Sequence, residues 1–178
     1  MAVMTISVGT TSAVAAASGG VPTGAVYSIL LLLHVGCAVI GFGALVLTGV
    51  QAGRAGRGPT SPRADAVRRY FRPGVNWAAR ALYGVPVFGL AVLSASGGAL
   101  SAGDGFVVGG LMLWTAAAFV AEGVVWPAER RIQEVVSQRW EDPDTTGTLR
   151  RDCRRVVVAA ALLAAVFVTA TALMVARP

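Results

Sequence analysis

The chain has 178 residues, of which 55% are hydrophobic and only 13% are charged. A soluble domain carries about 25% charged residues, so this composition excludes an ordinary soluble fold and favours a single membrane domain. The net charge of +6 does not indicate a nucleic-acid partner, because nearly all the basic residues fall in two segments between apolar runs. Cys37 and Cys153 are too few for a disulfide framework. Abundant Ala, Gly, Val and Arg without any Lys indicates a GC-rich, bacterial genome.

The first 26 residues are rich in Ser, Thr, Ala and Gly. The small residues at 12–20 resemble the end of a signal peptide, but neither a basic segment nor a sufficiently long apolar segment precedes them. We therefore expect residues 1–26 to form a flexible extracytoplasmic tail. The membrane domain is expected to comprise residues 27–178.

The first apolar segment, 27–50, is long enough to cross a bilayer core of about 30 Å, which needs roughly 20 helical residues. One face of this helix carries His34, Cys37, Gly41 and Thr48, which fall within about 60° of one another at helical spacing. Small residues on such a face let helices approach closely, and polar residues find partners across the interface. The stripe predicts a packing seam with a hydrogen-bonded histidine, although an ionisable residue inside a span is also a functional candidate.

The loop at 51–80 contains signals of local structure. Ser61 and Pro62 match a helix start, with the serine as N-cap and the proline in the first helical position. They predict a short amphipathic helix over residues 63–71. Trp77 is expected at the membrane interface, where the second transmembrane helix begins.

The second and third spans follow at 81–100 and 106–126. The second contains Pro86 and ends in a cluster of small residues. Trp126 is expected at the membrane interface, because it closes the third apolar segment. Both segments are long enough to cross the bilayer as helices.

The loop at 127–155 begins with a proline and is predicted to form an amphipathic helix over residues 128–140. Ile132, Val136 and Trp140 recur there at helical spacing, with charged residues between them. The fourth span, 156–175, carries no charge at all.

Seven arginines lie in each of the two long loops, whereas Arg177 is the only arginine on the opposite side. By the positive-inside rule, both loops are expected to be cytoplasmic and both termini extracytoplasmic. The predicted fold is an all-α, four-transmembrane-helix bundle in a bacterial cytoplasmic (inner) membrane, with short amphipathic helices in its cytoplasmic loops. The arginines expected to dock on anionic lipid headgroups or on a partner are Arg68, Arg69, Arg72, Arg150, Arg151, Arg154 and Arg155.

Depth in the membrane limits the partners of the ionisable residues inside the spans. At 1.5 Å per residue, His34 lies about 10 Å from the start of its helix and Glu122 about 24 Å from the start of the third helix. These helices start on the same side, so His34 and Glu122 are not expected to pair. Glu122 is expected to meet Arg80 or Arg155 instead.

Met112 lies about 9 Å along the third helix and therefore matches His34 in depth. A cluster of His34, Cys37 and Met112 would present an imidazole with soft sulfur ligands, which suit Cu(I). The expectation is that the protein holds no cofactor, with copper as an open alternative. A bis-histidine haem within the chain is excluded because His34 is the only histidine, while a His–Met haem remains a second alternative. No phosphate-binding, dinucleotide-binding, zinc-protease or nucleophile-elbow motif is present.

Several short stretches resemble a bacterial family of predicted integral membrane proteins of unknown function, itself distantly similar to the copper-resistance D membrane proteins. The resemblance extends over residues 27–140. The stretches are Leu32-Leu33-His34-Val35, Phe71-Arg72-Pro73, Trp77-Ala78-Ala79-Arg80, Val85-Pro86-Val87-Phe88-Gly89-Leu90 and Trp126-Pro127-Ala128-Glu129-Arg130. The resemblance implies a four-helix membrane fold and marks His34 as a possible metal ligand. The further ligands of the copper-resistance proteins have no counterpart in this sequence.

Without a catalytic constellation, the sequence favours a non-enzymatic membrane protein: an accessory or scaffold subunit of a larger membrane complex, or a homo-oligomer. Small-residue helix faces and basic loops are the features that would contact a partner. The alternative is a transporter of copper or another small solute, with His34 as a ligand. That alternative requires a polar pathway across both leaflets.

Overall fold

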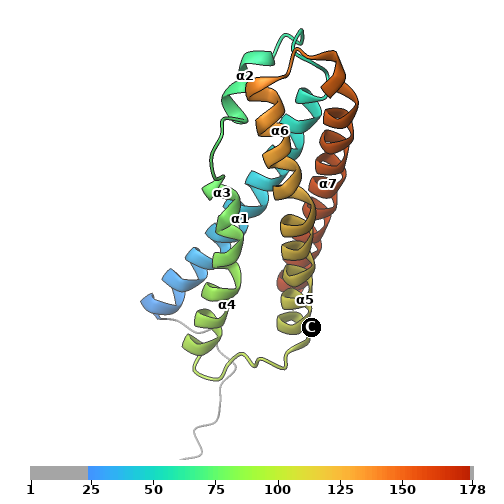
Figure 1. The fold of residues 1–178 in the computed structure, drawn as a ribbon. Helices are drawn as coiled ribbons and strands as arrows, with labels where there is room; N and C mark the ends of the chain where they lie inside the picture. Colours follow the sequence, from blue (N-terminus) through green and yellow to red (C-terminus); the bar gives the residue numbers. More distant parts are fainter. Residues whose placement is uncertain (1–23, 177–178) are drawn as a thin grey trace, which may run out of the picture.

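The computed structural model describes residues 24–176 and shows an all-helical protein in that range (Figure 1). No strand occurs among these residues. The predicted tail at 1–26 lies almost wholly outside them. The helices are α1 (Ala25–Ala55), α2 (Ala64–Tyr70), α3 (Trp77–Arg80), the 3₁₀-helix η1 (Ala81–Tyr83), α4 (Gly84–Ala95), α5 (Gly105–Val120), the π-helix η2 (Ala121–Val125), α6 (Trp126–Gln138), the 3₁₀-helix η3 (Pro143–Thr145) and α7 (Thr146–Ala176).

Four continuous helical segments are long and apolar enough to cross a membrane, which confirms the predicted number of spans. They are Ala25–Ala55, Trp77–Ala95, Gly105–Gln138 and Pro143–Ala176. Each segment has 19 to 34 residues and a high mean hydropathy, as a membrane-crossing helix requires. The fold class predicted from composition is therefore correct at the level of an all-α protein with four apolar helices.

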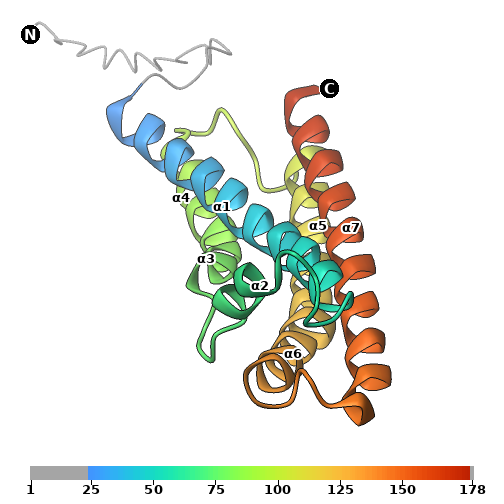
Figure 2. The ribbon, with the colours of Figure 1, turned by 90° about the horizontal axis from the view of Figure 1, so that it is seen from above.

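Different helix ends and connections lie at the two ends of the bundle (Figures 1 and 2). One end, called here the loop end, holds the end of α1, the helix α2 and the connection from α6 to α7. The other, called the terminal end, holds the start of α1, the end of α7 and the connection from α4 to α5. The two arginine-rich loops therefore gather at the loop end.

The helix that contains the third predicted span does not stop at Pro127. The segments α5, η2 and α6 run on without a break as Gly105–Gln138. A proline inside a helix lacks an N–H and its ring clashes with the carbonyl four residues earlier. The π-helical turn at Ala121–Val125 widens the backbone just ahead of Pro127, and such turns absorb this kind of local distortion. The separate amphipathic helix predicted at 128–140 is thus the second half of a long helix.

The second helix begins at Trp77, where the sequence predicts that it begins, but it ends before the predicted apolar segment does. Its helical segment starts at Trp77 and ends at Ala95 rather than running over 81–100. The end is set by Gly97 and Gly98, which have φ of +61° and +90°. These values lie in the left-handed region that glycine adopts without steric cost, and they turn the chain toward α5.

The first and fourth helices are longer than predicted. The helix α1 continues past residue 50 to Ala55, where Arg54 lies in the last turn and interacts favourably with the helix dipole. The helix α7 begins at Thr146, ten residues ahead of the predicted span. Its added turns lie against α6, where Arg131 donates to Asp152 at 2.9 Å, and Cys153 lies against Gly56 at the end of α1.

The short loop helix was predicted correctly to within a residue at each end, since α2 spans Ala64–Tyr70. Its predicted cap was wrong. The residue at the N-cap is Arg63, and no side chain caps the helix. Ser61 contributes its backbone instead, because the N–H of Ala64 donates to the Ser61 carbonyl at 2.9 Å.

The helix α1 lies at the centre of the bundle and contacts both α7 and the α3–η1–α4 segment. The predicted small and polar face of α1 forms the second contact. A Cβ at Gly41 would lie 2.6 Å from the Leu82 backbone nitrogen, and the Cys37 sulfur lies against Gly84. These contacts confirm that this face is a packing seam, as small residues on a helix face indicate.

Candidate functional site

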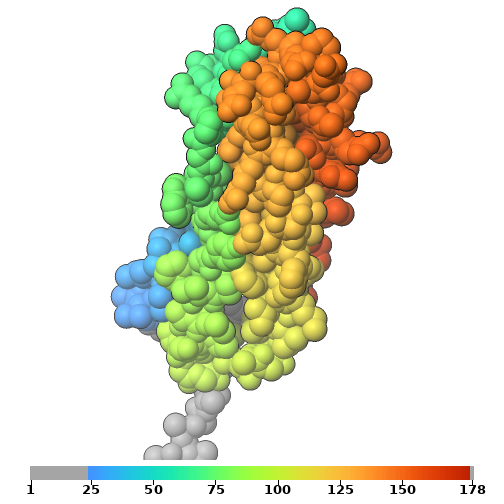
Figure 3. All heavy atoms as spheres, viewed as in Figure 1, coloured from blue at the N-terminus to red at the C-terminus, as the bar shows by residue number. Residues whose placement is uncertain are grey.

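The terminal half of the bundle contains an apolar cavity of about 250 Å³ between α1, α4, α5 and α7. His34 is its only ionisable side chain other than Tyr27, and the remaining walls are apolar or aromatic. The cavity exists because the backbones of α4 and α5 stay apart from each other. In the space-filling view, the surfaces of α4 and α5 border a narrow opening near the α4–α5 connection (Figure 3).

His34 is held on the α4 side of this cavity. Its Nδ1 lies 2.8 Å from the Val85 carbonyl oxygen, and a carbonyl only accepts, so Nδ1 carries the proton. The Nε2 atom of the neutral ring is then an acceptor and could bind one cation or one donor. Gly89 makes room for the ring, because a Cβ there would lie 3.1 Å from two of its atoms.

A second interhelical hydrogen bond closes the same wall. Pro86 has no N–H to donate to the Leu82 carbonyl one turn earlier. The indole N–H of Trp114 on α5 donates to this carbonyl at 2.9 Å. Pro86 therefore leaves the Leu82 carbonyl free to accept the hydrogen bond that links α5 to η1.

The structure does not gather the three predicted metal ligands around one point. Met112, which was predicted to lie at the depth of His34, is 68% exposed on α5 and does not line the cavity. Cys37 lies against Gly84 outside the cavity lining. Met174 of α7 lines the cavity with His34 instead. Within residues 24–176, no group of three or more His, Cys, Asp or Glu residues is placed to hold a metal ion.

We expect His34→Asn to keep the fold, because the amide of asparagine can replace Nδ1 as the donor to the Val85 carbonyl. Interhelical hydrogen bonds in membranes contribute only about 0.6 kcal/mol on average, so the thermal unfolding temperature in detergent should change by a few degrees at most. Elemental analysis and an absorption spectrum of the purified wild type should show no stoichiometric copper and no haem band. A metal or haem signal that disappears in the variant would contradict this expectation.

A polar network that the sequence analysis missed lies at the loop end. The Thr48 hydroxyl lies 2.7 Å from the Tyr70 hydroxyl. The Asn76 amide donates to Thr48, Tyr70 and Glu129, each at 3.4 Å. Glu129 is only 5% exposed. Burial raises the pKa of Tyr70 more than its hydrogen bond with Thr48 lowers it, so the tyrosine stays protonated and can donate.

Asn76 links this network to the backbone. Its side-chain oxygen accepts from the N–H of Ala79 and so caps α3. The Asn76 side chain therefore caps the first turn of the second apolar helix and also donates a hydrogen bond to the buried Glu129 carboxylate. No signal in the sequence linked Asn76 to Glu129, which lies 53 residues further along the chain.

The prediction for Glu122 is confirmed for one of its two candidate partners. Its carboxylate lies 3.7 Å from Arg80 and accepts a hydrogen bond from Tyr83. Arg155 pairs with Asp152 instead, at 3.7 Å. Glu122 is thus tied to the start of the second span.

Only one of the two predicted interface tryptophans is exposed. Trp77 is 78% exposed, whereas Trp126 is 4% exposed and belongs to the core. Arg80 lies 3.5 Å above the Trp126 ring, and Tyr83 lies beside it at 5.8 Å between ring centroids. The Trp126 ring is covered because the helix continues beyond it and the second span packs over it, whereas its place at the membrane interface stays a prediction.

The predicted docking arginines divide into two groups. Arg68 is engaged by Glu141 at 3.0 Å and lies 5.1 Å from the Trp140 ring, and Arg155 is engaged by Asp152. The others are exposed, and within residues 24–176 no carboxylate lies within 4 Å of them. These are Arg69, Arg72, Arg150, Arg151 and Arg154.

No protein family, curated protein or solved structure with which the chain was compared matches it.

Proposed function

We propose that this chain is a non-enzymatic integral membrane protein of a bacterial cytoplasmic membrane. It works as an accessory or scaffold subunit that binds a transmembrane segment of a partner, either another protein or a second copy of itself. The observation that carries the proposal is the side of the bundle where the backbones of α4 and α5 stay apart and leave the His34 cavity between them.

The size of the cavity supports a side chain as its occupant. Sites for small molecules usually have volumes of about 300–1,000 Å³, and an engineered cavity of about 150 Å³ binds benzene. The cavity here, at about 250 Å³, therefore suits one large apolar or aromatic side chain. A partner helix on this side would use such a side chain as its anchor, as buried aromatic residues do at interfaces.

The rim of the cavity supports the same proposal. Leu90 and Leu111 line it and are 59% and 49% exposed. Between helices in a membrane, association depends on close packing and hydrogen bonds rather than on hydrophobicity. His34 offers the unused Nε2 acceptor for such a hydrogen bond.

Site-specific photo-crosslinking tests the proposal. A photoreactive amino acid at position 90 or 111 should yield a protein adduct in native membranes, identified by mass spectrometry. Position 162 is the matched control, since Leu162 is 56% exposed on α7 but does not line the cavity. Lipid adducts alone at all three positions, together with a strictly monomeric mass in mild detergent, would contradict the proposal.

The alternative function, a transporter of copper or another small solute, would need a continuous polar path. His34 and Thr48 are 14 residues apart on α1, which is about 21 Å, and the close contact of Gly41 with Leu82 lies between them. The polar groups at the two ends thus favour a scaffold over a transport pathway.

We also propose that the loop end is cytoplasmic and that both termini are outside. An arginine costs about 2.5–3.5 kcal/mol at the membrane centre on insertion scales, so the loops stay on the side where synthesis leaves them. Reporter fusions at residue 60 and after residue 178 should report opposite compartments. A cytoplasmic signal from both positions would mean that one span has been assigned wrongly.

A further inference from the structure

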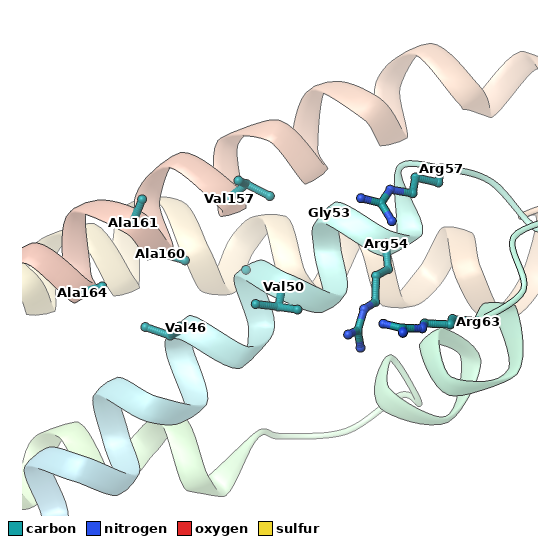
Figure 4. Close-up of a pocket in the computed structure, with 11 residues that line it drawn as sticks. Val46, Val50, Gly53, Arg54, Arg57, Arg63, Val157, Ala160, Ala161 and Ala164 are labelled. Carbon is teal, nitrogen blue, oxygen red and sulfur yellow. The ribbon is translucent and has the colours of Figure 1, made fainter.

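A groove of about 490 Å³ runs between α1 and α7 toward the loop end, separate from the His34 cavity. It is called here the arginine groove. Its walls are apolar along the helices and basic where α1 ends (Figure 4). The lining residues used below are Val46, Val50, Arg54, Arg57, Arg63 and Ala161.

The apolar part of the groove results from the small residues at the helix crossing. A Cβ at Gly49 would lie 2.3 Å from the Ala160 Cβ, so the two helices touch there. Beside this contact the α7 wall carries only short side chains, such as Ala161, opposite Val46 and Val50 of α1. The helices therefore leave a shallow apolar channel open along the crossing, as Figure 4 shows.

The basic part of the groove holds three arginines. Figure 4 shows the side chains of Arg54 and Arg63 pointing toward one another at the end of the groove, while the side chain of Arg57 lies apart from them on the α7 side. Arg54 donates to the Gln51 amide oxygen at 3.3 Å. In the part of the chain that the structure describes, no carboxylate lies within 4 Å of these three arginines, although five others form ion pairs.

The electrostatics of this corner favour an anion. The C-terminus of α1 carries a partial negative charge of about half an elementary charge, which three full positive charges outweigh. Guanidinium groups bind phosphate through paired hydrogen bonds. Arg54 and Arg63 point toward one another without a carboxylate between them, and Arg57 adds a third positive charge at the same end of the groove. This arrangement leaves a place for an acidic group that the described residues do not supply.

We propose that the arginine groove binds one anionic phospholipid, with its phosphate among Arg54, Arg57 and Arg63 and an acyl chain along Val46, Val50 and Ala161. A soluble phosphate would satisfy the arginines but would leave the apolar channel unused. A phospholipid satisfies both parts, and anionic lipids are attracted by basic segments next to membrane helices. This inference does not depend on the proposed partner-binding role.

Native mass spectrometry of the full chain in detergent tests the charged part. Phosphatidylglycerol should bind more tightly than phosphatidylcholine. The triple variant Arg54→Gln, Arg57→Gln, Arg63→Gln should lose about a hundredfold in apparent affinity for phosphatidylglycerol, because each arginine near an anionic lipid contributes roughly fivefold. The matched control removes the same number of exposed charges elsewhere, as Arg150→Gln, Arg151→Gln, Arg154→Gln. An equal loss in both variants would show diffuse attraction and overturn the proposal.

Two further measurements test the apolar part. Ala161→Phe narrows the channel without changing a charge and should weaken phosphatidylglycerol binding, whereas Leu162→Phe, outside the groove, should not. Glycerol 3-phosphate should fail to compete with the lipid. Unchanged binding in a folded Ala161→Phe protein, or full competition by glycerol 3-phosphate, would overturn the lipid assignment. The arginine-to-glutamine variants add no bulk between the helices. They therefore still test the proposal if the Ala161→Phe protein does not fold.

Discussion

Gly41→Ala should destabilise the protein by about 2 kcal/mol, within the range of about 1–3 kcal/mol for overpacking a tight contact. The added Cβ would lie 2.6 Å from the Leu82 nitrogen and 2.9 Å from its Cα. Both are backbone atoms, which cannot move aside as a flexible side chain can. The helix α1 would have to separate from η1, and the shift would also disturb the contact between Cys37 and Gly84.

The matched control is Gly43→Ala, two residues further along the same helix. A Cβ at Gly43 would have no atom within 4 Å, so this variant should be as stable as the wild type or more so, since alanine favours a helix over glycine. Thermal unfolding followed by circular dichroism in one detergent compares the three proteins. Equal unfolding temperatures for Gly41→Ala and Gly43→Ala would mean that the seam is not as close as described.

Asn76→Ala should cost about 2–4 kcal/mol, since it removes two kinds of interaction at once. Loss of the cap on α3 accounts for about 1 kcal/mol. The same change leaves Glu129, which is 5% exposed, without its amide donor, and an unsatisfied buried polar group costs about 1–3 kcal/mol. Chemical unfolding of the purified protein in mixed micelles would measure the loss.

A double-mutant cycle separates the two contributions to that loss. With Glu129→Leu in place, Asn76→Ala should cost only the cap, so the two changes should be strongly non-additive. Gln133→Ala is the matched control, because its exposed amide donates to the Gly74 carbonyl at 3.3 Å in the same loop; its effect should stay within about 0.5 kcal/mol. Additive effects of Asn76→Ala and Glu129→Leu would contradict the network.

Membrane insertion explains why the sequence predicted the helices well and their ends poorly. Four apolar segments of about 20 residues are a direct consequence of bilayer thickness, and the structure has four helices long and apolar enough to match them. The ends depend on other forces. Pro127 looked like a stop, but a π-turn carries the helix through it. Likewise, α7 starts ten residues early because its first turns pack on α6.

Counting residues along a helix predicts a depth for each candidate site residue, but it does not predict toward which side of the helix the residue points. Counting residues at 1.5 Å each placed His34 and Met112 at the same level. The apolar residues of α5 follow no helical period that would mark its inner face, so nothing in the sequence indicated that Met112 points away while Gly110 and Trp114 line the cavity. On α1, by contrast, the stripe of small and polar residues identified the packed face, because close approach demands small side chains.

The sequence by itself determined the membrane-spanning helices, the face of α1 that packs and the gathering of arginines in two loops, because these follow from hydropathy, side-chain size and charge along one segment. Only the tertiary structure decided which distant residues meet. It brought Asn76 to the buried Glu129, buried Trp126 under Arg80, left α4 and α5 apart, and set three arginines at the end of an apolar groove. Such pairings depend on how helices cross and where loops fold back, and no single segment encodes them.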